Sequence, residues 1–392
     1  MPRFFSSRLS WDARPNALTR MVEDKRRSGA AVVDLTESNP TRAGLVYDGD
    51  SILAALGDPR SLVYEPAPAG LTRARAAVAA YYAAQGHPVS PDHIVLTAST
   101  SEAYAWLFKL LADPGDEILV PRPSYPLFEF LAGLESVRLR HYPLAYHERW
   151  WIDRKAFEAA VTGRTRAVVI VNPNNPTGSF LKRDELEWLG PLCGARGLAI
   201  LSDEVFADYS FAADERRVPT LAGFEGALVF SLGGLSKMAG LPQMKLGWIV
   251  AGGSLNARAG AVARLEWIAD TYLSAGAPVQ NAAARLFELR AGFQEQMRRR
   301  LRGNLDLLRA ALQPSSPCRL LEPEGGWYAT LQLPRTRGEE EWVLGLLEHT
   351  NVLVQPGYFY DFSSEPFVVL SLLTPEETFR EGVRRLLAYA PG

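Results

Sequence analysis

The sequence predicts an α/β fold in which a mostly parallel sheet is covered by helices on both faces and joined to a smaller α+β part. Two observations predict it. From about residue 91 to 250, short continuous apolar runs alternate with helical patterns, as in parallel sheets that are buried on both faces. After about residue 312, short strands and turns rich in Pro and Gly replace this pattern. A doubly wound core with a second, smaller unit accounts for both.

Six apolar runs, rich in Val, Ile and Leu, are the expected strands of the large sheet. They cover residues 94–96, 117–120, 167–171, 198–201, 228–230 and 247–250. Helical patterns predict helices over residues 102–111, 183–193, 281–312 (one long or kinked helix) and 375–388. We therefore expect a large domain over residues 48–280 and a small domain formed by residues 1–47 and 281–392.

Composition excludes several classes of function. The net charge is -2 and no run of five or six like charges occurs, so neither a nucleic-acid surface nor a membrane-binding stripe is indicated. Two cysteines far apart in the sequence do not suggest a disulfide framework, and the five histidines lack metal-ligand spacing. The chain starts without an apolar signal segment. We expect a soluble, cytoplasmic protein without a metal site.

Two segments early in the core suggest a site for a flat, anionic ligand. Residues 95–103 (VLTASTSEA) form a strand, a turn of small residues and a helix start, where free backbone N–H groups can bind an anion. The alternative is that Ser99 or Thr100 simply caps the helix. Tyr125, between Pro123 and Pro126, could stack on a flat ring, although a packed turn tyrosine is the simpler interpretation.

Residues 169–178 (VIVNPNNPTG) end a buried strand in a loop dense with Asn and Pro. Ligands bind at such strand ends in open α/β sheets. Asp203 likewise follows an apolar strand directly, at the poorly solvated edge of the sheet. A carboxylate there needs a cationic partner to remain ionised, and a protonated pyridine nitrogen would be one. The alternative is that Asp203 caps the next helix.

Lys237 lies in a glycine-rich segment between two apolar strands, within residues 230–237 (FSLGGLSK). Partial desolvation and nearby positive charge would lower the pKa of its amine and make it nucleophilic toward aldehydes. An exposed loop lysine is the alternative, but it does not explain the apolar flanks.

These five segments, in this order and spacing, resemble the class I/II aminotransferases, which are pyridoxal 5′-phosphate (PLP) enzymes of fold type I. The resemblance runs from about Val33 to the C-terminus. It implies a seven-stranded type of large sheet, a homodimer with composite active sites, and transfer of an amino group between an amino acid and a 2-oxo acid.

The resemblance also implies a role for each matching residue. Lys237 is similar to the lysine that holds PLP as a Schiff base and shuttles a proton, Asp203 to the partner of the pyridine nitrogen, and Asn175 to the partner of the phenolic oxygen. Tyr125 matches the stacking ring, so the expected catalytic residues are Lys237, Asp203 and Tyr125. The expected phosphate ligands are Ser99, Thr100, Ser236, Lys245 and, from across the dimer interface, Tyr64.

The sequence departs from the family pattern at four positions. Phe206 replaces a tyrosine that supports the phenolic oxygen, Gly234 replaces a phosphate-binding serine, and Lys245 replaces an arginine. The fourth departure is Val369, which stands where the family has the arginine that binds the substrate carboxylate. Arg42 is the best substitute that the sequence offers, the alternative being an ordinary surface residue.

The expected substrate residues are Asn39, Arg42, Asn175 and Trp327, where Gly325-Gly326-Trp327 resembles the segment that closes over substrate. Because the usual carboxylate-binding arginine is missing, a PLP-dependent lyase or another α-carbon reaction is the alternative function. A regulator built on the same fold would need an additional DNA-binding domain, for which residues before Val33 leave no room.

Overall fold

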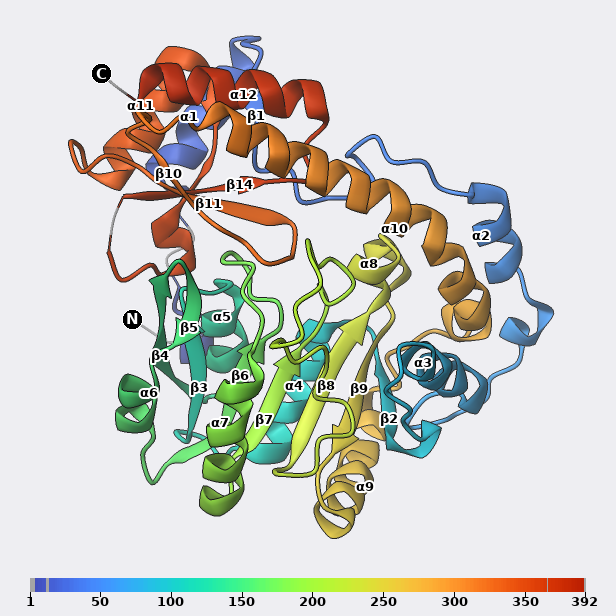
Figure 1. The fold of residues 1–392 in the computed structure, drawn as a ribbon. Coiled ribbons are helices and arrows are strands. Elements are labelled where there is room, and N and C mark those ends of the chain that lie inside the picture. Colours follow the sequence, from blue (N-terminus) through green and yellow to red (C-terminus); the bar gives the residue numbers. More distant parts are fainter. Residues whose placement is uncertain (1–3, 12–13, 365, 391–392) are drawn as a thin grey trace.

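Eight strands form the large sheet in the order β2-β9-β8-β7-β6-β3-β4-β5. The computed structural model describes residues 4–11, 14–364 and 366–390 (Figure 1). Four neighbouring pairs are parallel (β3–β4, β3–β6, β6–β7, β7–β8) and three are antiparallel (β2–β9, β8–β9, β4–β5), which confirms the mostly parallel sheet. The strands are β2 Ile94–Thr97, β3 Glu117–Arg122, β4 Arg138–His147, β5 Arg149–Ile152, β6 Thr165–Val171, β7 Ala199–Asp203, β8 Val229–Gly234 and β9 Gly247–Gly252.

The sheet has two more strands than the six apolar runs, and one more than the seven-stranded type that the resemblance implied. The missed strands, β4 and β5, form an antiparallel hairpin at one edge of the sheet. Most residues of β4 are partly or fully exposed, with Arg138, Arg140 and His141 among them. An edge strand of this kind lacks the continuous apolar run that identifies a strand buried on both faces.

Helices cover both faces of the large sheet because its inner strands are apolar on both. Val169 and Val171 of β6 belong to one apolar core with helices α4, α5 and α9, whereas Val168 and Ile170 belong to another with α6 and α7. Helix α3 and the first half of α10 cover the end of the sheet that contains β2 and β9. The helices are α3 Thr72–Ala84, α4 Thr100–Leu111, α5 Leu127–Leu134, α6 Arg154–Ala160, α7 Arg183–Arg196, α8 Leu235–Met238, α9 Leu255–Tyr272 and α10 Ala277–Ala311.

A four-stranded antiparallel sheet, in the order β10-β11-β14-β13, lies beyond the carboxyl ends of the large sheet's parallel strands (Figure 1). The N-terminal segment joins this part, because β1 pairs in parallel with β12. The second half of α10 packs in the same apolar core as α11 and α12. The remaining elements are α1 Ala17–Arg27, β1 Val33–Asp34, α2 Gly49–Leu56, β10 Arg319–Leu321, β11 Tyr328–Gln332, α11 Glu339–Thr350, β12 Val352–Leu353, β13 Gln355–Pro356, β14 Phe367–Ser371 and α12 Glu376–Tyr389, with short 3-10 helices η1 Ser7–Leu9, η2 Pro59–Leu62, η3 Pro91–His93, η4 Pro242–Met244 and η5 Gly357–Tyr360.

Two kinds of feature are absent from the described part of the chain. None of its helices combines the length and apolar character needed to cross a membrane. Its His, Cys, Asp and Glu side chains also do not gather in any group of three or more that could hold a metal ion.

Candidate active site

The ends of four strands bring the expected residues to one edge of the large sheet. Strands β2, β6, β7 and β8 end at Thr97, Val171, Asp203 and Gly234. β2 is antiparallel to β9, which is antiparallel to β8, so all four strands run in the same direction and end at the same edge. The backbone N–H of Asn172 donates to the Asp203 carbonyl at 2.7 Å. The loop after β6 and the end of β7 are therefore fixed side by side, where open α/β sheets bind ligands.

Lys237 lies in α8, the single helical turn that directly follows β8. Its Nζ is 5.0 Å from the centre of the Trp327 ring and 5.8 Å from that of the Phe206 ring. The Tyr209 hydroxyl donates to the Lys237 carbonyl at 2.7 Å, which fixes the backbone. Burial lowers the pKa of the Lys237 amine, and the Asp203 carboxylate opposes this lowering. An amine with a lowered pKa is more often neutral, and therefore more nucleophilic, than an exposed lysine.

Asp203 is the last residue of β7 and has two hydrogen-bond donors. The Tyr104 hydroxyl donates to its Oδ2 at 3.0 Å, and the Val205 N–H donates to its Oδ1 at 3.2 Å. Burial nevertheless raises the pKa of Asp203 to about 6, against the effect of these two bonds and of the Lys237 charge. A carboxyl group in this environment is stabilised as an anion by a further cationic partner.

The loop after β6 presents a polar group that has no partner among the described residues. The Thr177 hydroxyl donates to Asn174 Oδ1 at 3.0 Å, and the Gly178 N–H donates to the Asn174 carbonyl at 2.8 Å, so the loop is internally braced. Asn175 is 6% exposed, and its buried Oδ1 accepts no hydrogen bond. An unpaired buried polar atom is costly, so the amide is poised to bind a ligand.

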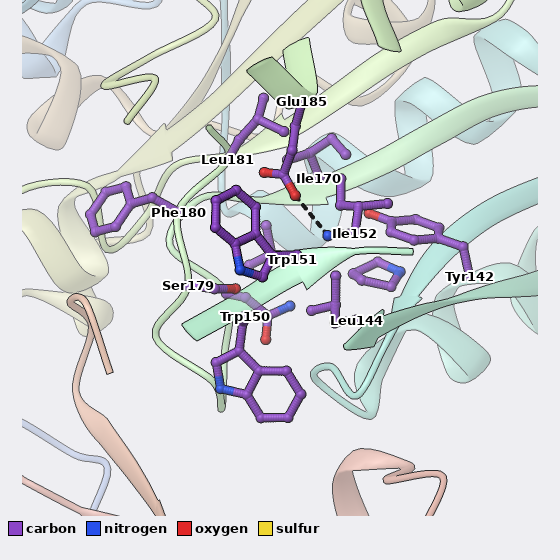
Figure 2. A pocket seen from close by; sticks show the side chains of 13 residues that line it. Tyr142, Leu144, Trp150, Trp151, Ile152, Ile170, Ser179, Phe180, Leu181 and Glu185 are labelled. Carbon is purple, nitrogen blue, oxygen red and sulfur yellow. Dashed lines mark hydrogen bonds between the residues drawn. The ribbon is translucent and has the colours of Figure 1, made fainter. Parts of the chain in front are cut away.

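A cavity of about 20 Å³ lies on the other side of this loop, against the β4–β5 hairpin. Figure 2 shows Ser179, Phe180 and Trp151 around it, with the Glu185 carboxylate accepting the Ile152 N–H at 2.7 Å. The volume suffices for about one water molecule. The cavity is therefore a packing feature and is too small for a substrate.

The first turn of α4 lies beside the start of β9. Ser99 caps the helix, because its Oγ accepts the Glu102 N–H at 3.2 Å, and the Glu102 carboxylate accepts the Ala98 N–H at 2.6 Å. A Cβ on Gly247 would lie 3.2 Å from the Thr100 nitrogen, so only glycine permits this approach without displacement. Ser99 therefore caps α4, which was the alternative interpretation of this segment. The remaining free N–H groups of the turn can still bind an anion.

The other expected phosphate ligands differ in how far they are buried. Ser236 is half-buried beside Lys237 in α8, whereas Lys245 is exposed and adopts a left-handed backbone with φ of 54°. Tyr64 is 77% exposed and lines an open groove of about 330 Å³. Among the described residues, no interaction joins Tyr64 to Lys237 or Asp203 of the same chain.

Three tyrosines meet where the two sheets face each other. Tyr125 is 46% exposed, and the pKa of its hydroxyl is raised by burial and by the Asp203 charge. The pKa values of Tyr328 and Tyr360 are raised by burial and, in addition, by their proximity to Tyr125. Tyr328 on β11 also packs edge-on against Phe206, with ring centres 6.3 Å apart. The role of Tyr125 as a ring that covers a ligand stays a prediction.

The segment that contains Trp327 is firmly attached to the large sheet. Trp327 is fully buried, and its Nε1 has no hydrogen-bond partner. The Glu324 N–H donates to the Gly178 carbonyl at 3.1 Å, and the Glu324 carboxylate accepts a hydrogen bond from Lys182 Nζ at 2.6 Å. Both charged side chains of this ion pair are almost completely buried. In this conformation Trp327 is thus a fixed wall of the Lys237 site.

Val369 lies on the face of the small sheet that is turned toward the large one. Thr330 and Gln355 are directly opposite Val369 on the neighbouring strands, so the three side chains share a face. The Thr330 hydroxyl is 3.5 Å from the carbonyl oxygen of Pro176, in the loop that carries Asn175. In the family that the sequence resembles, an arginine stands at the position of Val369. Here Val369 and its two neighbours on this face of the sheet, Thr330 and Gln355, are uncharged.

The N-terminal candidates are not joined to this centre. Asn39 Oδ1 accepts the N–H and the hydroxyl of Thr41, at 3.0 and 2.7 Å, within its own turn. Arg42 is exposed, and its guanidinium has no hydrogen-bond or salt-bridge partner among the described residues. Both interpretations of Arg42, substrate ligand and surface residue, remain compatible with this placement.

The structure adds residues that the sequence did not single out, chiefly Tyr104, Tyr209 and the Lys182–Glu324 pair. Tyr104 could have been found, because it lies one helical turn after Thr100 on α4 and so faces the same end of the sheet. Nothing local in the sequence indicates that Tyr209 reaches the Lys237 carbonyl, or that Lys182 and Glu324 meet across 142 residues.

Comparisons with known proteins agree with this arrangement. Residues 35–386 match the family model described as aminotransferase class I and II. The chain is 29% identical over 304 residues to the arginine–pyruvate transaminase of Pseudomonas aeruginosa, covering 77% of this chain and 75% of that one. It is 32% identical to the glutamate–pyruvate aminotransferase of Escherichia coli, over 54% of this chain and 53% of that one.

Solved structures show the same fold over almost the full length. An aminotransferase from Escherichia coli superposes with a TM-score of 0.86 at 24% identity, covering 100% of this chain and 99% of that one. An alanine aminotransferase from Pyrococcus furiosus superposes with a TM-score of 0.88 at 23% identity, covering 99% of each chain.

Proposed function

We propose, from the premise that this chain belongs to the aminotransferase class I and II family, that it holds PLP covalently on Lys237 at the edge of the large sheet. The family assigns the reaction: the protein is an aminotransferase, an enzyme that moves an amino group between an amino acid and a 2-oxo acid. Its fold is that of fold type I. The observation that carries the proposal is the position of Lys237: it lies in the helical turn that follows β8, its Nζ is 5.0 Å from the centre of the buried Trp327 ring, and Asp203 ends the neighbouring parallel strand β7.

The residues at the site fit the chemistry of PLP. A pyridine ring needs a carboxylate partner for its nitrogen, and Asp203 is a buried carboxyl group with capacity for one more partner. The phenolic oxygen needs a hydrogen-bond donor, which the side-chain NH2 group of Asn175 can supply; the buried Oδ1 of the same amide accepts no hydrogen bond from the described residues, which supports a role for this side chain in binding a ligand. The phosphate needs N–H groups and hydroxyls, which the first turn of α4 and Ser236 offer. Tyr125 and Phe206 supply aromatic surface.

When bound, PLP supplies an electron sink that stabilises negative charge at the substrate α-carbon. Asp203 keeps a proton on the ring nitrogen, because an ionised carboxylate stabilises the cation beside it. Lys237 Nζ takes the proton from the substrate α-carbon and returns it on the other side of the transfer, as a base whose pKa is lowered by burial. Tyr125 and Trp327 exclude water from this proton transfer.

Further properties follow from the family pattern. We propose a homodimer in which Tyr64 reaches the partner subunit's phosphate site, since Tyr64 is 77% exposed on its own chain.

The two cysteines, Cys193 and Cys318, are buried and unpaired, which supports a cytoplasmic location. The division into residues 48–280 and residues 1–47 with 281–392 is retained as the domain proposal.

A substrate panel tests the function. The purified holoenzyme is mixed with each of the common amino acids and with pyruvate, which is the acceptor named for two relatives. Transamination predicts that a new 2-oxo acid and alanine appear in equal amounts. Release of ammonia with retention of the cofactor, and no alanine, would instead establish the lyase alternative.

A further inference from the structure

The helical turn that carries Lys237 is too short to fix its own position by helical hydrogen bonds. α8 has four residues, and the last carbonyl groups of a helix have no partner within it. The Leu235 carbonyl accepts the Ala239 N–H at 3.1 Å. The carbonyl groups of Lys237 and Met238 accept hydrogen bonds from side chains that lie elsewhere in the fold. The position of the Lys237 backbone therefore depends on these side chains.

Tyr209 supplies the first of these donors. Its hydroxyl donates to the Lys237 carbonyl at 2.7 Å and lies 3.4 Å from the Met238 carbonyl. Because Tyr209 is only 1% exposed, water does not compete for this bond. Tyr209 lies in the segment that follows Asp203 at the end of β7, and its N–H donates to the Phe206 carbonyl at 3.0 Å. The residue that holds the Lys237 turn is thus part of the segment that leads away from Asp203.

Gln294, in the middle of α10, supplies the second donor. Its Nε2 donates to the Met238 carbonyl at 2.9 Å, and the residue is 5% exposed. Arg298 donates to Gln294 Oε1 at 3.0 Å, so the amide is oriented with its NH2 group toward α8. The first half of α10 packs in the core beside β2 and β9, and the second half packs in the core of the small sheet. The Lys237 turn is therefore attached to the helix that joins the two parts of the fold.

Tyr209 also holds the segment that contains Trp327. The Tyr209 carbonyl accepts the Gly326 N–H at 2.9 Å. A Cβ on Gly325 would lie 2.6 Å from the Tyr209 carbonyl oxygen, so this close approach requires glycine. The Tyr209 ring packs edge-on against Trp327 with ring centres 5.5 Å apart, and the Trp327 ring centre is 5.0 Å from Lys237 Nζ. One residue therefore fixes both the backbone of Lys237 and the ring beside its amine.

We propose that Tyr209, supported by Gln294, is a positioning residue for the reaction and holds Lys237 Nζ where it binds PLP and transfers the proton. Tyr209 acts through the backbone of Lys237 and transfers no proton itself. Placement matters because a misplacement of about 1 Å at a reacting group can cost about 100-fold in rate. The inference rests on the proposed function, because it takes Lys237 as the reacting amine.

The test compares Tyr209→Phe, which removes the hydroxyl and keeps the ring, with Tyr142→Phe as the matched control. Tyr142 is also 1% exposed, and its hydroxyl also donates to a backbone carbonyl at 2.7 Å, that of Val169 on β6. Because the two variants lose the same kind of bond, both should lower the melting temperature by a similar amount. Only Tyr209→Phe should lower kcat, by about fivefold, with an unchanged KM for the best amino donor of the panel.

A second measurement follows the Lys237 amine without PLP. The cofactor-free proteins are treated with a trace of acetic anhydride at a series of pH values, and the labelling of each lysine is quantified by mass spectrometry. Exposed Lys245 in the same digest is the internal reference. Burial lowers the pKa of Lys237, and a loosened turn would let water reach the amine. The pH of half-maximal Lys237 labelling should therefore rise in Tyr209→Phe and stay unchanged in Tyr142→Phe.

Gln294→Met keeps the length of the side chain and removes the amide, so it should change both measurements in the same direction; if Tyr209→Phe does not fold, Gln294→Met decides alone. If Tyr209→Phe matches Tyr142→Phe in kcat and in Lys237 labelling, the hydroxyl only stabilises the fold and the inference is overturned. The proposed function fails in a different way, when no amino donor yields a 2-oxo acid with the unsubstituted enzyme. In that case the labelling comparison still tests whether Tyr209 positions Lys237.

Discussion

The hydroxyl of Tyr104 on α4 lies 3.0 Å from Oδ2 of Asp203 and donates a hydrogen bond to it. This bond favours the ionised carboxylate, whereas burial favours the protonated acid, and the balance places the pKa of Asp203 at about 6. Tyr104 therefore favours the charged form of Asp203, which is the form that our proposal requires beside the ring nitrogen of PLP.

Tyr104→Phe should weaken retention of PLP by about 2 kcal/mol, the usual worth of a hydrogen bond to a charged group. The acid limb of the activity profile should move to higher pH, because the pKa of Asp203 rises when a donor to its charged form is lost. Equilibrium dialysis of PLP and a pH–rate profile measure the two effects. Tyr142→Phe is the control, since the Tyr142 hydroxyl bonds to the Val169 carbonyl instead. Equal PLP retention in both variants would contradict the assigned role.

Asp203→Asn should make the cofactor-free protein more stable at pH 7.5. The pKa of Asp203 in the folded chain, about 6, lies above the ordinary value of 3.8, so the folded state binds the proton more tightly than the unfolded chain does. The stability of the unsubstituted protein therefore rises as the pH falls from above 6 toward 4, and ionisation at pH 7.5 costs stability. Asparagine removes this cost.

Thermal unfolding of both cofactor-free proteins at pH 7.5 and pH 5 checks this. The advantage of Asp203→Asn should shrink at pH 5, where Asp203 is mostly protonated. An advantage of the same size at both pH values would show that the carboxyl group is not destabilised by burial.

The sequence predicted the core of this fold better than its edges. Apolar runs identified β6, β7, β8 and β9 because these strands are buried on both faces. The partly exposed β4 gave no such signal. At the site, the position of Asp203 at the carboxyl end of β7 and of the Asn175 loop after β6 could be predicted from the apolar strands that precede them, whereas the role of each side chain came only from the family resemblance.

Contacts between distant segments could not be predicted. The Lys182–Glu324 pair, for example, depends on how the two parts of the fold face each other, which no local pattern encodes. Arg42 was predicted from the family resemblance, because it follows the N-terminal segment that passes along the substrate side of the cofactor in that family, and it is exposed in the structure.

Tyr64→Phe should weaken PLP retention by about 1 kcal/mol, the worth of one ordinary hydrogen bond, if Tyr64 serves the partner subunit. The loss should be the same at every protein concentration at which the dimer persists. Equilibrium dialysis gives the affinity and analytical ultracentrifugation gives the assembly state. A stable monomer with full activity would rule out the composite site.

Arg42→Ala should raise KM for every amino acid tested by a similar factor, with little change in kcat or in PLP affinity, if Arg42 binds the substrate carboxylate. This pattern reports the loss of an interaction that substrate and transition state share equally. Arg380→Ala is a control on the solvent-facing side of α12, where Arg380 pairs with Glu376. If Arg42→Ala is kinetically silent, the carboxylate is bound elsewhere or the substrate has no α-carboxylate. Equal turnover of an amine that lacks a carboxylate would show that no such clamp exists.

The most direct test of the central claim is to find which lysine carries the cofactor. The holoenzyme is reduced with borohydride, which makes the link between PLP and the amine permanent, and is then digested and mapped by mass spectrometry. The pyridoxyl group should be found on Lys237, and Lys237→Ala should fold, bind no PLP covalently and lose turnover. A label on Lys182, Lys245 or any other lysine would contradict the account.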